Sequence, residues 1–146
     1  MLDPSGNGLG CYDKQDYGSD DVRKCIVVAM FGGYFGERRF CKENSYLIIE
    51  TPDEWFRCNP DGADAAKLLP PADFYPQMPV AERMVDKHWS VIKELAAELQ
   101  SRDWEPIKPL GSGFEWWNEG ETVAKYVTGE ELIGILAARG IAASLV

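Results

Sequence analysis

Hydrophobic positions in the first third of the chain recur at helical spacing. They begin just after Ser19, a residue type that caps helix N-termini, and two acidic residues follow where the helix dipole favours anions. The pattern predicts a buried helix over residues 20 to about 41. Its apolar face consists of Val22, Cys25, Ile26, Ala29 and Met30. Gly32, Gly33 and Gly36 lie inside this helix, and because each costs about 1 kcal/mol against alanine, they predict close approach by another element or a break.

The middle of the chain predicts shorter elements. Residues 46–49, with the sequence Tyr-Leu-Ile-Ile, are a strand candidate, and a polar loop is expected from there to about residue 60. Residues 61–69 favour a short helix. Residues 70–79 contain four prolines, which predict that this stretch is not regular helix.

The clearest pattern in the sequence is a helix over about 79–102. Pro79 suits the first position of a helix, where its missing N–H is not needed. A helix of this length with an apolar stripe is expected to pack against a partner element. The stripe consists of Val80, Met84, Val85, His88, Ile92, Leu95, Ala96 and Leu99.

Residues 103–127 form a Trp-rich insertion with turn signals. We interpret it as a loop with a hairpin that pairs residues 114–117 with residues 123–127. Thr128 and Glu131 then form a capping-box signature, which predicts a last helix from there to about Arg139. Gly140 is expected as the residue that ends it.

These elements predict a mainly α (α+β) fold with short strand or hairpin elements. Residues 1–18 are rich in glycine and other turn formers and are expected to be a loop or short hairpin. The sequence shows no internal repeat and no low-complexity tract. The chain is therefore expected to be one domain over residues 1–146.

Composition narrows the classes of partner. The chain has 146 residues and a net charge of −9, so it lacks the basic surface that phosphates or an anionic membrane would need. We expect no nucleic acid and no membrane partner. The N-terminus has no signal-peptide pattern, and the longest nearly apolar run, residues 25–36, is about half of a bilayer span. The expected location is cytoplasmic.

The cysteines carry little chemical information. Cys11, Cys25, Cys41 and Cys58 contain no closely spaced pair of the kind that structural zinc sites use. We expect four reduced, mostly buried thiols, because free cysteine favours burial.

The chain contains one histidine, His88, so a two-histidine metal site cannot be built from this chain alone. Because His88 lies on the apolar face of the predicted 79–102 helix, we expect it to pack rather than to act as a general base. No acid–base dyad stands out among the carboxylates, and no catalytic or cofactor-binding residue is predicted. Trp116 and Trp117 are expected to pack, or to form a patch that binds a partner.

Several segments, taken in order, resemble the peptidase domain of the FtsH-type, ATP-dependent zinc metalloproteases (peptidase family M41). Residues 4–10 are similar to the family's P-x-G-x-x-L-G turn, and residues 23–40 resemble the helix that carries its G-G-R-x-A-E segment. Residues 61–69 are similar to the segment that supplies the family's acidic zinc ligand. Residues 81–99 and 128–132 resemble its long helix and its closing L-x-G-E-E-L helix. The resemblance implies a compact helical module.

The sequence departs from this family at the residues that bind zinc and catalyse peptide hydrolysis. Tyr34 and Gly36 replace the usual arginine and alanine, and Asp64, the candidate acidic ligand, stands about two positions early. The family's H-E-x-x-H motif, which supplies two zinc ligands and the general base, is missing, and so is the ATPase module. The chain as it stands is therefore not expected to be a peptidase or to hold zinc, although Asp64 would be a ligand if the motif lay upstream.

Three hypotheses remain open. The first is a non-catalytic, metallopeptidase-like domain that binds an unknown protein partner or associates with itself. The second is that the chain is a truncated part of a zinc metallopeptidase whose H-E-x-x-H lies upstream. The third is an unrelated helical interaction domain.

Overall fold

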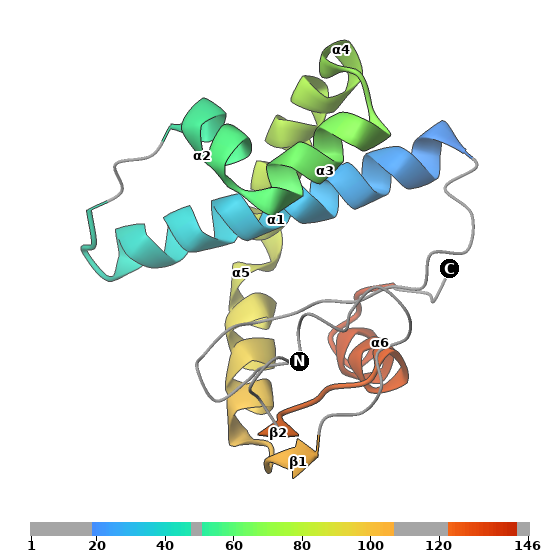
Figure 1. The fold of residues 1–146 in the computed structure, drawn as a ribbon. Coiled ribbons are helices and arrows are strands. Elements are labelled where there is room, and N and C mark those ends of the chain that lie inside the picture. The colour runs from blue at the N-terminus through green and yellow to red at the C-terminus, as the bar shows by residue number, and fades with distance from the viewer. Residues whose placement is uncertain (1–18, 48–50, 107–122, 143–146) are drawn as a thin grey trace. The chain divides into compact units, whose positions relative to one another are not determined.

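The computed structural model describes residues 19–47, 51–106 and 123–142 (Figure 1). The protein is mainly helical, as predicted, with one short pair of strands. Its described residues fall into two compact units, which divide between Trp89 and Ser90 and are described separately below. The prediction of a single domain stays a prediction.

The first unit is built on helix α1, Asp20–Glu43, which confirms the predicted helix over residues 20–41. Ser19 is its N-cap, and the Ser19 hydroxyl accepts a hydrogen bond from the Val22 amide at 3.3 Å. The predicted apolar face is wrong by about one position. The buried side chains are Val27, Phe31 and Tyr34, because Phe31 and Tyr34 pack against the aromatic rings of Phe56 and Trp55.

The glycines of α1 do not have the predicted role. The helix continues without a break through Gly32, Gly33 and Gly36. A methyl group placed on any of the three would meet nothing within 4 Å. The expectation of close approach or a break is therefore wrong.

Two short helices pack beside α1 where one helix and a polar loop were predicted. Helix α2, Pro52–Cys58, replaces most of the loop, and α3, Pro60–Leu68, confirms the helix predicted over residues 61–69. Thr51 and Glu54 form a capping box at the start of α2, where the Thr51 amide donates to the Glu54 carboxylate at 2.8 Å. Tyr46 and Leu47 are not in a strand. The rest of that strand candidate lies outside the described residues.

The proline-rich stretch is helical, contrary to the prediction. It contains helix α4, Pro71–Phe74, a 3₁₀ turn η1, Tyr75–Gln77, and the start of α5, Met78–Ser101. Proline is tolerated here because Pro71, Pro76 and Pro79 each lie in the first turn of their element. A proline in a first turn loses no helical hydrogen bond. Helix α5 otherwise confirms the helix predicted over residues 79–102.

An aromatic cluster forms the core of the first unit. Phe31 lies between three rings, with centroid distances of 5.8 Å to Phe56, 6.3 Å to Phe74 and 6.5 Å to Trp55. Phe56 also stacks on Phe74 at 4.6 Å. These contacts hold α1, α2 and α4 together around one side chain that is 1% exposed.

The second unit contains the rest of α5, two short strands and the last helix, α6. Strands β1, Glu105–Pro106, and β2, Val123–Ala124, pair antiparallel. The second strand lies where it was predicted, and the proposed partner, residues 114–117, lies outside the described residues. Helix α6, Gly129–Ala137, starts at the predicted capping box of Thr128 and Glu131.

The end of α6 confirms the role of Gly140. Its φ of 72° is in the left-handed region, where glycine carries no penalty from a side chain. The Gly140 amide donates to the Ala137 carbonyl, and the Ile141 amide donates to the Leu136 carbonyl, both at 3.0 Å. This pair of bonds is a Schellman motif.

Candidate functional site

The candidate metal ligand, Asp64, lies on the surface of α3. Its side chain is 55% exposed, and its carboxylate is 2.7 Å from the Lys67 ammonium group. Burial, and then the charge of Asp64, raise the pKa of the nearby Asp61. Within the described ranges, no three or more His, Cys, Asp or Glu side chains are grouped so that they could hold a metal ion.

The remaining candidate residues lie apart from any common site. His88 is half-buried on α5, and the neighbouring Trp89, which the predicted apolar stripe omitted, is buried. Met84, which the stripe included, is 51% exposed. Trp116 and Trp117 lie outside the described residues.

The expectation of mostly buried thiols is wrong for the cysteines that the structure describes. Cys25 and Cys58 are exposed, Cys41 is half-buried, and all three are free. Cys25 is exposed because the buried face of α1 follows Val27 and Phe31 instead.

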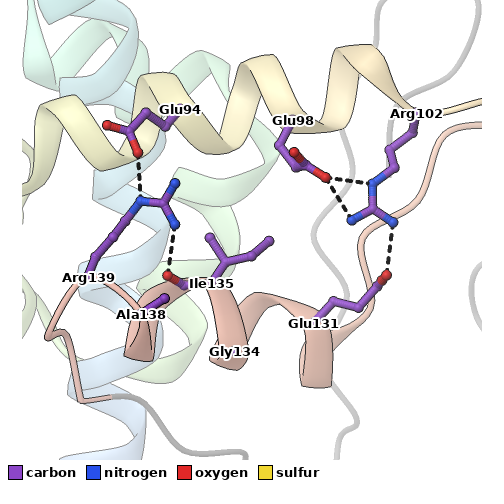
Figure 2. A pocket seen from close by; sticks show the side chains of 8 residues that line it. All are labelled: Glu94, Glu98, Arg102, Glu131, Gly134, Ile135, Ala138 and Arg139. Carbon is purple, nitrogen blue, oxygen red and sulfur yellow. Dashed lines mark hydrogen bonds and ion pairs between the residues drawn. The ribbon is translucent and has the colours of Figure 1, made fainter.

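The second unit contains an open groove between α5 and α6, with a volume of about 490 Å³ (Figure 2). Arg102 donates to Glu131 at 2.8 Å and to Glu98 at 3.1 Å. Arg139 donates to Glu94 at 2.6 Å and to the Ile135 carbonyl at 2.9 Å. The remaining lining residues are Gly134 and Ala138.

The charges of this α5–α6 groove are engaged with one another. The Thr128 amide, the Arg102 guanidinium and the Thr128 hydroxyl, in that order, lower the pKa of Glu131 to about 2. Hydrogen bonding to Glu131 in turn raises the pKa of Arg102. Both arginines therefore tie α6 to α5 and are poor candidates for binding a ligand.

The first unit contains a second groove, of about 410 Å³, which we call the α1–α5 groove. Its α1 side carries three cations and its α5 side carries two anions, and Arg39 joins the two sides through an ion pair of 2.6 Å with Asp86. Arg38 donates to the Tyr34 hydroxyl at 2.6 Å. The groove is lined by Phe35, Arg38, Arg39, Lys42, Tyr46, Leu47, Glu82, Val85 and Asp86.

A strained turn at the end of α1 places apolar side chains beside this groove. Ser45 has a φ of 59°, in the left-handed region that costs a non-glycine residue about 1–2 kcal/mol. The Tyr46 amide closes the turn by donating to the Cys41 carbonyl at 2.9 Å. Beyond the turn, Tyr46 is 62% and Leu47 is 84% exposed. Phe40, 50% exposed, lies 6.1 Å from the Tyr46 ring.

We call Phe40, Tyr46 and Leu47 the apolar cluster. Neither groove is lined by the serine, cysteine or histidine side chains that most covalent and acid–base mechanisms use. The α1–α5 groove offers charges of both signs next to exposed apolar surface. This combination is suited to binding a protein surface.

Sequence reasoning missed this site. The signal was present in part, because Arg38, Arg39 and Lys42 stand close together in an acidic chain. The hydrophobic pattern predicts a buried helix for the same segment and a strand for the apolar residues after it.

None of the helices in the described ranges combines the length and the apolar character that crossing a bilayer requires. No protein-family model, no curated protein and no solved structure matches this chain.

Proposed function

We propose that the chain is a non-catalytic, metallopeptidase-like module that binds a protein, either a different partner or a second copy of itself. The observation that carries this proposal is the exposure of the apolar cluster beside the α1–α5 groove, led by Leu47 at 84%. Single exposed apolar residues are common, but grouped aromatic and aliphatic side chains beside arginines are typical of protein contacts. The resemblance to the FtsH-type peptidases supplies the proposed helical frame and no chemistry.

The proposal also names a compartment and a class of partner. We propose a cytoplasmic protein with a protein partner rather than nucleic acid or a membrane. The net charge of −9 supports this choice of partner, because it opposes contact with phosphates. The free thiols of Cys25, Cys41 and Cys58 support the compartment, because thiols stay reduced in the cytosol.

The test compares two surface variants of the full chain. Tyr46→Ser combined with Leu47→Ser removes most of the apolar cluster, and both side chains are exposed, so the core is untouched. Leu132→Gln, on the 38% exposed Leu132 of α6, is the matched control. Complexes are measured by sedimentation velocity of the purified chain and by quantitative affinity capture from its source cells.

The wild type and the control are expected to form the same complex, and the double variant is expected to lose it. A hot-spot residue of this type contributes about 2 kcal/mol or more to binding, which corresponds to roughly thirtyfold in affinity. If the double variant keeps every complex of the wild type, or if the wild type forms none, the proposal fails.

The tryptophan pair predicted from the sequence is proposed as a further contact. Sedimentation and capture are repeated with Trp116→Ala combined with Trp117→Ala. We expect a loss of mass or of partner. If the chain is a monomer without a partner both before and after the substitutions, the result counts against this patch.

A further inference from the structure

The α1–α5 groove has two walls of opposite charge. Arg38, Arg39 and Lys42 stand on the α1 wall, and Glu82 and Asp86 stand on the α5 wall. The Arg39–Asp86 ion pair of 2.6 Å joins the walls within one molecule. Outside this pair, Glu82 remains on the α5 wall, and Lys42 and Arg38 remain on the α1 wall, where Arg38 donates to the Tyr34 hydroxyl. In the described part of the chain, neither the exposed Lys42 nor the exposed Glu82 has an ion pair or a hydrogen bond through its side chain.

A patch of this kind is complementary to itself. When two copies meet about a two-fold axis, each residue on one wall faces the other wall of the second copy, and every contact occurs twice. The cationic wall of each copy then meets the anionic wall of the other. The exposed Tyr46 and Leu47 lie in the same lining and would be covered by the meeting surfaces.

We propose that a second copy of this chain docks across the α1–α5 groove, with Lys42 of each copy paired to Glu82 of the other. The inference rests on the proposed function and names its partner. The chain carries a net charge of −9, so most of its surface repels an acidic protein. Charge therefore favours an occupant that presents both signs at the groove, as a second copy of the chain does. Two such chains repel one another except where a local patch balances its own charge, and this groove carries both signs.

A charge-swap experiment tests the pairing. Lys42→Glu makes both faces of the contact acidic, and Glu82→Lys makes both basic, so each variant alone places like charges opposite each other twice. In an equimolar mixture the two variants restore both attractive contacts. Lys24→Glu is the matched control, because it makes the same charge change on α1 about 27 Å away along the helix.

Sedimentation equilibrium of the full chain gives the dimer dissociation constant. We expect a dimer for the wild type and for Lys24→Glu. Each single variant is expected to dissociate at least about tenfold more readily, because close like charges across an interface are strongly unfavourable. The mixture is expected to recover the dimer. Circular dichroism checks that each variant is folded. If Lys42→Glu is misfolded, the comparison of Glu82→Lys with the Lys24→Glu control tests the pairing.

The outcomes separate this inference from the proposed function. A wild type that stays monomeric, or a dimer that tolerates both single variants, overturns the pairing. If the wild type is monomeric but binds another protein that Tyr46→Ser with Leu47→Ser abolishes, the groove has a different occupant and only the proposed function stands. If no complex forms, both fail.

Discussion

Two glycine-to-alanine changes should have opposite effects on stability. Gly33 is exposed in the interior of α1, and a methyl group there meets nothing within 4 Å. Alanine is favoured over glycine in a helix interior by about 0.8–1 kcal/mol. Gly33→Ala should therefore raise the free energy of unfolding by about 1 kcal/mol. For a chain of this size, that gain corresponds to about 2–4 °C in Tm.

Gly62→Ala also replaces glycine by a residue with higher helix propensity, but there is no space for the added methyl group. A methyl group on Gly62 would overlap the carbonyl oxygen of Phe56 and lie 2.7 Å from the Phe56 carbonyl carbon and Cα. Backbone atoms cannot rotate away as a side chain can, so α2 and α3 would have to shift. Overpacking of this kind costs about 1–3 kcal/mol, which leaves a net loss of up to about 2 kcal/mol.

Urea unfolding of both variants and the wild type measures this difference. Tryptophan fluorescence, to which the buried Trp55 and Trp89 of the first unit contribute, reports on tertiary packing, and circular dichroism reports on total helix content. The two probes must give coincident transitions before a free energy is taken from the midpoints. A destabilised Gly33→Ala variant would refute the argument, because it would require a neighbour against that face of α1. A stabilised Gly62→Ala variant would refute the packing of α2 on α3.

Three further outcomes are expected. Phe31→Ala should lower the free energy of unfolding by about 3–5 kcal/mol in the same urea assay, and a loss under 1 kcal/mol would contradict its central place in the core. Because folding lowers the pKa of Glu131 from 4.5 to about 2, its stabilisation is present above pH 4.5 and is lost as the pH falls towards 2. Glu131→Gln should remove that part of the pH dependence of α6 helicity, and an unchanged profile would contradict the role of this carboxylate. Metal analysis of the purified chain should find no stoichiometric zinc, whereas bound zinc that Asp64→Ala removes would favour the truncated-peptidase hypothesis.

The helix ends could be predicted because their signals are local. Ser19, Thr128 and Gly140 each act through backbone groups within a few residues, and all three have their predicted roles. The start of α2 has an equally local signal, in which Thr51 and Glu54 form a capping box around a proline at the first helical position. That signature stands in the sequence after strand-like residues and among polar residues, a setting that predicts a loop instead.

Burial could not be predicted as well, because it depends on partners distant in sequence. Helical spacing alone allowed either of two adjacent stripes on α1. The aromatic residues of α2 and α4 select the stripe that contains Phe31, since stacked rings fill that space. The same dependence explains why Trp89 is buried and Met84 is exposed on α5.

The candidate site shows this limit most clearly. Its two walls stand about forty residues apart in sequence, and nothing near Lys42 indicates that Glu82 shares its groove. Only the fold brings the basic end of α1 beside the acidic start of α5, and only the left-handed turn at Ser45 places Tyr46 and Leu47 beside both. Under the proposed function, this arrangement of charges and apolar side chains is complementary to a partner surface.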